Sequence, residues 1–282
     1  MITLSRLVDA SSAAQEGERQ LADSLSLTAV VDTALCVGAG GSSGSLADKP
    51  ILKNAKGRLV IPASQLKGRL RHECEKLARS LGWPVCESPA AERMCPQRAG
   101  LSETEEDSFR RRDYRLKETP GEAYSKTQSH CIICQIFGNP AIPARLQFSD
   151  LVCTTPKDAI PEVLRPGVSI NRRRRTAEEQ KLYFLETSPA NAGLEFEGSM
   201  QFQSAWQNLE QSGEAVPFAK ALVLVGLKHI YALGGSKSTG LGWLHWKFDA
   251  EEFANLETAW DWLGNAQQNS VGENPVEDGG AG

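Results

Sequence analysis

Ser64, Lys67 and Arg71 have the residue types and the spacing of a phosphate-binding site at the start of a helix. The strand-like run Leu59–Ile61 stops at Pro62, and Ser64 then stands where an N-cap hydroxyl accepts a first-turn amide. The free amides of a helix N-terminus favour an anion, and Lys67 and Arg71 lie one turn apart beside them. The alternative interpretation is a solvated helix face with ordinary surface cations.

The helix that must position these side chains is indicated by the apolar residues that follow Ser64. Leucine or cysteine recurs at spacings of four, four, three and four, at Leu66, Leu70, Cys74, Leu77 and Leu81. This period places them on one face of a helix that packs against a core.

Asp48 is a second candidate for chemistry. It lies at the far side of a glycine-rich loop, Val37–Ser45, that follows an alternating strand-like run from Leu25 to Leu35. The loop lacks the GxGxxG spacing of a dinucleotide site. A lone aspartate shortly before Pro50 is typical of a turn, which is the interpretation that the local sequence favours.

Cys131 and Cys134 have the CxxC spacing that lets two thiolates reach one tetrahedral zinc ion. Cys86 and Cys95 could complete a four-cysteine site, and His130 and His72 are alternative ligands. Such a site would pin the polar, aperiodic segment 82–134, which we interpret as an insertion without a core of its own. The alternative is buried free thiols, the interpretation that we prefer for the remaining cysteines, Cys36, Cys74 and Cys153.

Two further stretches could hold a polyanion. Four adjacent arginines, Arg172, Arg173, Arg174 and Arg175, lie between strand-like pieces and predict a protruding basic hairpin, although charge runs are usually solvated loops. The loop Gly234–Gly242 offers backbone amides and Lys237 to phosphate, but it lacks the spacing of a P-loop.

Composition limits the class of protein. The chain of 282 residues has a formal net charge of -4, but residues 249–282 hold eight acidic residues and no Lys or Arg, so the remainder is net positive. Seven cysteines favour thiols or metal ligands over disulfides. Neither a signal sequence nor a membrane span is visible, and we expect a cytoplasmic protein.

Four stretches in this order resemble the RAMP superfamily, and specifically the repeated backbone subunit (Csm/Cmr type) of type III CRISPR effector complexes. The stretches are Asp48–Pro50 through Ile61–Arg71, then Cys131–Gly138, then Val168–Arg172 continuing to Ala177 and Glu186, and finally Leu233–Gly242. The resemblance covers roughly residues 24–248.

The resemblance implies an α+β fold with a ferredoxin-like (RRM-like) RAMP core, a zinc-pinned insertion and a protruding thumb hairpin. The expected organisation is an N-terminal extension (1–23), a RAMP domain (24–248) with the insertion at 82–134 and the thumb hairpin at 168–197, and an acidic, disordered tail (249–282).

The resemblance also implies roles for individual residues. Asp48 matches the position from which active members cut target RNA at regular intervals with Mg²⁺ or a similar divalent ion. Arg172 to Arg175 match the thumb that is pushed between bases. The residues that match elements holding the guide backbone are Ser64, Lys67, Arg69, Arg71, Gly235, Ser236, Lys237 and Ser238.

The expected function is therefore guide-RNA binding and metal-dependent cleavage of complementary target RNA in antiviral defence. The expected partners are guide (CRISPR) RNA, target RNA, other RAMP subunits and the large subunit of the complex, with no membrane. One alternative is a scaffold that binds guide RNA without cutting. A remote alternative is a serine acyl-enzyme, since Ser64-Gln-Leu-Lys67 satisfies SxxK, but no SDN or KTG triplet follows.

Overall fold

The computed structural model describes residues 23–38, 47–111, 130–202, 210–211, 214–215 and 218–248, together with Asp261 and Leu263. The predicted N-terminal extension, the part of the glycine-rich loop after Gly38 and most of the acidic tail lie outside the described residues. The same holds for positions 112–129 of the predicted insertion.

The central sheet has six strands, all paired antiparallel. Its strands are β1 (Asp23–Val31), β2 (Val60–Ile61), β3 (Leu146–Phe148), β4 (Leu151–Cys153), β7 (Leu194–Phe202) and β10 (Leu244–Lys247). The order across the sheet is β10-β1-β7-β4-β2, and β3 also pairs with β7. Strands from both ends of the family resemblance, β1 and β10, are therefore neighbours.

Strand β1 follows the predicted alternation, but it ends at Val31, whereas the predicted run continued to Leu35. Leu27, Ala29 and Val31 are buried in the core, and Ser24 and Ser26, which precede them, are exposed, whereas Val30 on the opposite face is buried as well. Because successive side chains of a strand point to opposite faces, Leu27, Ala29 and Val31 share the face that packs on the core, whereas Ser24 and Ser26 lie on the other face.

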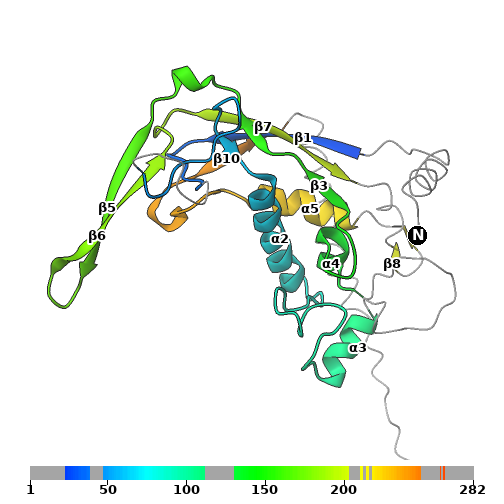
Figure 1. Cartoon of the computed structure of the whole chain (residues 1–282). Coiled ribbons are helices and arrows are strands. Elements are labelled where there is room, and N and C mark those ends of the chain that lie inside the picture. The colour runs from blue at the N-terminus through cyan, green and yellow to red at the C-terminus, as the bar shows by residue number, and fades with distance from the viewer. Residues whose placement is uncertain are drawn as a thin grey trace, which may run out of the picture.

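The described helices are α2 (Ala63–Ser80), α3 (Glu103–Arg111), α4 (Ile132–Phe137) and α5 (Phe218–Lys228), with 3₁₀ turns η1 (Lys157–Ala159) and η3 (Lys237–Thr239). Helices α2 and α5 pack against each other on one side of the sheet (Figure 1). The predicted stripe of α2 is confirmed, because Leu66, Leu70 and Cys74 are fully buried.

The start of α2 differs from the prediction. The N-cap position is Pro62, which has no side-chain cap, and the Ala63 amide donates to Asp150 Oδ1 at 2.8 Å. Ser64 is therefore inside the first turn and is exposed. The prediction that Ser64 caps the helix was wrong, because a carboxylate from the turn between β3 and β4 takes that role.

Strands β5 (Val163–Asn171) and β6 (Thr176–Thr187) form a separate two-stranded hairpin that extends away from the sheet (Figure 1). Leu194–Glu197, which the sequence analysis grouped with this hairpin, begins β7 of the central sheet. A short hairpin, β8 (Glu210–Gln211) and β9 (Glu214–Ala215), completes the described elements.

The α+β class is confirmed by this mixture of helices and antiparallel sheets. In the parts of the chain that the structure describes, no helix combines the length and the hydrophobicity that a membrane span requires.

The contact between α2 and α5 predicts a stability difference between two glycine substitutions. A Cβ at Gly226 would lie 2.6 Å from the buried Cys74 Sγ, whereas a Cβ at Gly68 on α2 would meet open space. We expect Gly226→Ala to lower the free energy of unfolding by about 1–3 kcal/mol through overpacking. Gly68→Ala should raise it by roughly 0.5–1 kcal/mol, since alanine loses less backbone entropy in a helix.

Urea denaturation followed by circular dichroism measures both changes. Equal stability of the two variants would contradict the close helix packing.

Candidate nucleic-acid interface and metal centre

Asp48 is exposed and is attached to the β5–β6 hairpin by its side chain. The Phe184 amide of β6 donates to Asp48 Oδ2 at 2.7 Å. Lys49 forms a parallel bridge with Leu185, and its amide donates to the Phe184 carbonyl at 3.3 Å. The aspartate thus has a fixed place at the base of the hairpin.

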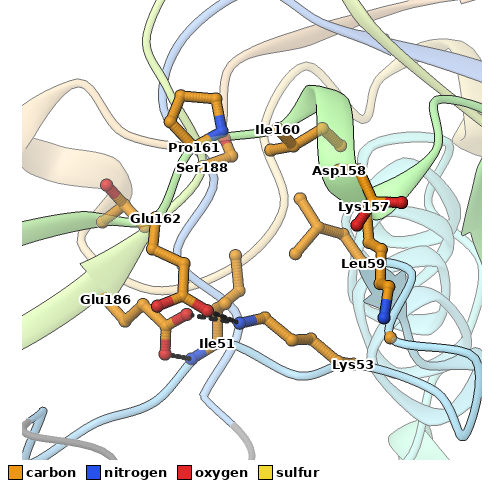
Figure 2. A pocket seen from close by; sticks show the side chains of 12 residues that line it. Ile51, Lys53, Leu59, Lys157, Asp158, Ile160, Pro161, Glu162, Glu186 and Ser188 are labelled. Atoms are coloured by element: carbon orange, nitrogen blue, oxygen red, sulfur yellow. Dashed lines mark hydrogen bonds and ion pairs between the residues drawn. The ribbon is translucent and has the colours of Figure 1, made fainter.

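Glu186 strengthens this attachment from further along β6. Its side chain is buried and accepts hydrogen bonds from the Ile51 amide at 3.2 Å and from Lys53 Nζ at 2.8 Å (Figure 2). Lys53 also contacts Glu162, just before β5, at 2.8 Å. Lys53 therefore joins the segment after Asp48 to both strands of the hairpin.

The tip of the hairpin carries the four arginines. Arg172, Arg173, Arg174 and Arg175 are all exposed. Asn171 shapes the turn, because its carbonyl accepts from the Arg175 amide at 2.7 Å and its side chain from the Arg174 amide at 3.1 Å. The predicted basic run therefore does connect two paired strands.

One face of the hairpin is apolar and exposed, which the sequence analysis did not notice. Leu164, Val168 and Ile170 alternate along β5 with exposed fractions of 44%, 50% and 63%. Leu182 of β6 lies opposite Val168 and is 57% exposed. The period-2 alternation of apolar residues from Leu164 to Ile170 was a signal that could have revealed this face.

The cations of α2 have different surroundings. Arg69 contacts the buried Glu73 at 2.7 Å, and Arg71 contacts Glu75 at 3.1 Å, so both are neutralised within the helix. Lys67 has no acidic partner among the described residues. Burial and the charge of Arg71 lower the pKa of the Lys67 ammonium. A phosphate at Lys67 would relieve this repulsion.

The first-turn amides of α2 are less available than predicted. The Ala63 amide donates to Asp150, and those of Gln65 and Leu66 donate to the Pro62 carbonyl. The side chains of Ser64 and Lys67 are therefore more available to an anion than these three amides are.

The loop Gly234–Gly242 is anchored at its neck and exposed at its tip. Its neck is tight, because Gly242 has φ of +72° and a Cβ there would lie 1.8 Å from the Leu233 carbonyl oxygen. The Gly235 amide donates to the Cys36 carbonyl at 2.6 Å. The exposed residues of the tip include Gly235, Ser236, Lys237 and Ser238.

The segment after β1 brings these loops together. The Leu52 amide donates to the Val37 carbonyl at 2.8 Å, while the Cys36 carbonyl holds the Gly234–Gly242 loop. Asp48 and that loop are therefore both linked to the short segment Leu35–Gly38. They lie far apart in the sequence, and their common anchor could not be read from it.

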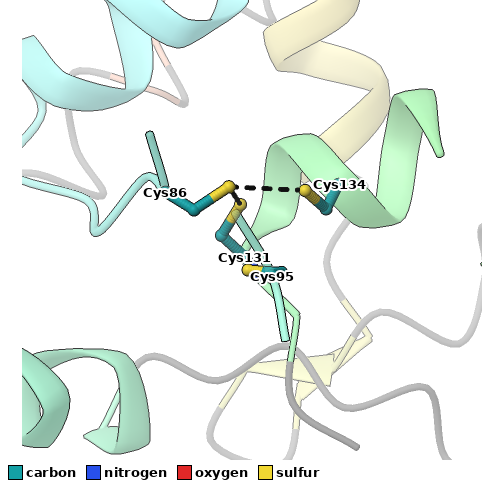
Figure 3. Close-up of side chains that lie close together, drawn as sticks. All are labelled: Cys86, Cys95, Cys131 and Cys134. Atoms are coloured by element: carbon teal, nitrogen blue, oxygen red, sulfur yellow. Dashed lines mark hydrogen bonds between the residues drawn. The ribbon is translucent and has the colours of Figure 1, made fainter. Parts of the chain in front are cut away.

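Four buried cysteines form a cluster at the end of α2 and the start of α4 (Figure 3). The Sγ atoms of Cys86, Cys95, Cys131 and Cys134 all lie within 4.8 Å of one another. Cys86 Sγ lies 3.5 Å from Cys134 Sγ and 3.7 Å from Cys131 Sγ. The structure thus brings together the four cysteines named from the sequence.

These distances fit a tetrahedral metal site. Zinc–sulfur bonds of about 2.3 Å place the sulfur atoms of a tetrahedron about 3.8 Å apart. Four thiolates suit zinc, and the cluster is closed to solvent, as structural zinc sites are. Neither alternative histidine belongs to it: His72 is exposed on α2, and His130 Nδ1 lies 3.1 Å from Asn139 Nδ2.

The charge of the cluster is met by arginines. Hydrogen bonds from Cys131 and then Cys134 lower the pKa of the Cys95 thiol. The buried Arg98 guanidinium lies 3.5 Å from Cys95 Sγ and contacts Glu106 at 2.7 Å. Four thiolates around a divalent ion carry two negative charges, and Arg98 offsets part of them.

Arg71 connects the cluster to α2. Its guanidinium lies 3.8 Å from Cys134 Sγ and donates to the Gly138 carbonyl at 3.0 Å. The family resemblance implies that Arg71 holds guide RNA, a role that stays a prediction. Its contacts in the structure lead toward the cysteines.

Metal analysis of the purified chain tests this centre. We expect about one zinc ion per chain, absent from Cys131→Ser and from Cys134→Ser, because three thiolates cannot close the tetrahedral site. Cys153→Ser is the matched control, since Cys153 is a buried thiol outside the cluster and its variant should keep the metal. Wild-type protein that lacks metal and is as thermally stable as zinc-loaded protein would contradict the assignment.

Two aromatic side chains also border the loop Gly234–Gly242, and the sequence pattern had not indicated them as site residues. Tyr231 and Trp243 flank it on either side and are both exposed. An aromatic residue at each end of a loop with phosphate-binding character was the available signal.

Comparison with known proteins places the chain in a family. A family model described as the RAMP superfamily matches residues 28–245, from within β1 to β10. No curated protein matches the chain significantly. The family match spans the central sheet, both packed helices, the hairpin and the cysteine cluster. The chain belongs to the RAMP superfamily, and this membership implies a CRISPR-associated RNA-binding subunit.

Proposed function

We propose that this chain is a guide-RNA-binding backbone subunit of a type III CRISPR effector complex and cleaves complementary target RNA at regular intervals through Asp48. One observation carries the proposal: an exposed aspartate is fixed by the Phe184 amide to the base of an exposed hairpin with four arginines at its tip. A hairpin that bends RNA and a carboxylate beside it would act on the same nucleotides.

The fold is part of the proposal. The order β10-β1-β7-β4, with α2 after β1 and α5 after β7, supports a ferredoxin-like core in which the two helices cover one face. The β5–β6 hairpin would be the thumb, and the zinc-bound segment 82–134 an insertion. The RAMP domain would span residues 24–248.

Guide RNA would run past the loop Gly234–Gly242, the start of α2 and the hairpin. The exposed tip Gly235–Ser238 would contact phosphates through amides and Lys237, and Lys67 would supply an ammonium without an acidic partner among the described residues. Base pairing between the two RNAs, and not the protein, would set the target sequence.

The chemistry needs few protein groups. A nucleotide bent at the hairpin can bring its own 2′-hydroxyl in line with the next phosphorus, which supplies the nucleophile and much of the acceleration. The 2′-oxygen would bond to phosphorus as the 5′-oxygen leaves and takes up a proton from water, giving a 2′,3′-cyclic phosphate and a 5′-hydroxyl. Asp48 would take up the 2′-hydroxyl proton or orient the water that does so.

A divalent ion would find one carboxylate at this place. Among the described residues, the cysteine cluster is the one group of three or more metal-ligating side chains, so Asp48 has no acidic companions of that kind. Mg²⁺ commonly keeps several waters and binds one or two carboxylates plus substrate phosphates. Asp48 with RNA phosphates would suit it, and the ion would neutralise charge on the reacting phosphate.

The alternative is a scaffold that binds guide RNA without cutting. The hydrogen bond from the Phe184 amide to Asp48 favours this alternative, because holding the hairpin would explain an aspartate at this position without any role in cleavage. In both functions the partners would be guide and target RNA, further RAMP subunits and the large subunit of the complex. Zinc would have a structural role in either.

Replacing Asp48 with asparagine separates the two functions. Asparagine keeps an acceptor for the Phe184 amide but cannot take up a proton, so Asp48→Asn should retain the hairpin's position and slow cleavage by on the order of 10²- to 10⁴-fold. The measurement is cleavage of labelled target RNA by the assembled, guide-loaded complex with and without Mg²⁺.

Asp32→Asn is the control, since Asp32 is an exposed aspartate beyond β1 that pairs with His245. Cleavage at the wild-type rate by Asp48→Asn, with guide and target bound, would show that Asp48 does not cut the RNA. This chain would then be the scaffold, and the cleavage would come from elsewhere in the complex.

The arginines at the hairpin tip predict a salt dependence. Changing Arg172 to Arg175 to alanine should weaken RNA binding and reduce the slope of log K against log salt by about one for each phosphate that is no longer neutralised. Fluorescence anisotropy at several salt concentrations measures this slope. Arg93→Ala is the control, because Arg93 is exposed but pairs with Glu87 in the insertion. An unchanged slope would show the tip to be a solvated loop.

A further inference from the structure

Tyr231 and Trp243 have an unusual exposure for aromatic side chains. They are 57% and 49% exposed, and within the described residues they are the only exposed large apolar side chains outside the β5–β6 hairpin. Their ring centroids lie 5.7 Å apart at an interplanar angle of 61°. Exposed aromatic rings in a defined arrangement are typical of binding sites.

Backbone hydrogen bonds fix the two residues on both sides of the loop Gly234–Gly242. The Leu244 amide donates to the Tyr231 carbonyl at 2.9 Å. The Trp243 amide donates to Thr33 Oγ1 at 2.9 Å, and its carbonyl accepts from the Asp32 amide at 2.8 Å. The backbone that carries the two rings is therefore fixed before any ligand arrives, which lowers the entropy cost of binding.

A cation adjoins the pair. The Arg69 guanidinium carbon lies 6.0 Å from the centroid of Tyr231. Its Nη2 contacts Glu73, but its buried Nε has no hydrogen-bond partner among the described residues. Lys237 lies at the exposed tip of the same loop. The aromatic rings thus lie beside the Glu73-paired guanidinium of Arg69 and next in the chain to a loop that carries Lys237.

We propose that Tyr231 and Trp243 form a stacking site for one unpaired RNA base, whose flanking phosphate is held by the Gly234–Gly242 loop. This inference rests on the proposed RNA binding and deepens it. A base needs an apolar ring surface next to a phosphate donor, and the neck and the tip of this loop offer both. Stacking tolerates any base, which suits a protein that carries guides of any sequence.

RNA fits this site better than a protein partner does. Two side chains offer far less apolar area than stable protein interfaces bury, which is about 800 Å² on each partner. The flanking residues of the loop are polar or cationic, as expected beside a polyanion. A second copy of the chain at this surface is the competing occupant, and the experiment separates the two.

The experiment uses the full chain and a fluorescent single-stranded RNA. Trp243→Ala should weaken binding by about 5- to 150-fold, the range for removing one stacked base, and leave the salt slope unchanged because every phosphate remains bound. Trp243→Phe should restore most of the affinity. An oligonucleotide with abasic positions throughout should bind wild type and Trp243→Ala equally.

His245→Ala is the matched control, since His245 is exposed on β10, two residues after Trp243. It should bind RNA like the wild type. Wild-type affinity in Trp243→Ala, or equal losses of affinity in both variants, would overturn the stacking site while the proposed function stands. Loss of self-association in Trp243→Ala on light scattering, with RNA affinity unchanged, would also overturn it and assign the surface to a second copy.

Absence of salt-dependent RNA binding by the wild type would overturn the proposed function and the stacking site together. In the guide-loaded complex, the same variant identifies the strand that supplies the base. Weaker guide retention points to the guide, and weaker target retention alone points to the target; no effect on either overturns the site.

Discussion

The buried carboxylate of Glu186 is the interaction on which the candidate site depends. It binds the Ile51 amide and Lys53 through its side chain, while its own amide donates to the Lys49 carbonyl at 3.1 Å. A buried charge is retained only where such partners satisfy it. By joining the segment after Asp48 to the second strand of the hairpin, Glu186 fixes the aspartate relative to the arginine tip.

Local pattern predicted the elements whose cause is local. The period of Leu66, Leu70 and Cys74 gave a helix with the correct buried face, and the alternation after Leu25 gave β1 with the correct inward side chains. The start of α2 was misread because its cap is Asp150, a residue 87 positions away from Ala63. No local pattern can reveal a cap that only the folded sheet supplies.

The candidate site was predicted unevenly for the same reason. The cysteine cluster followed from the CxxC spacing, because metal geometry constrains sequence spacing directly. The separate environments of the α2 cations did not, since pairing of Arg69 with Glu73 and contact of Arg71 with Cys134 depend on side-chain direction and on α4. The exposed aromatic pair also depends on the tertiary fold, which brings the two sides of one loop together.

The proposed path of RNA runs along the loop Gly234–Gly242, the start of α2 and the hairpin tip. Ultraviolet cross-linking of the guide-loaded complex, followed by mass spectrometry of the cross-linked peptides, tests it most directly. We expect cross-links in peptides that contain Lys67, Arg172 to Arg175 and Lys237. Cross-links confined to the insertion 82–134, or to Ser24 and Ser26 of β1, would contradict this path.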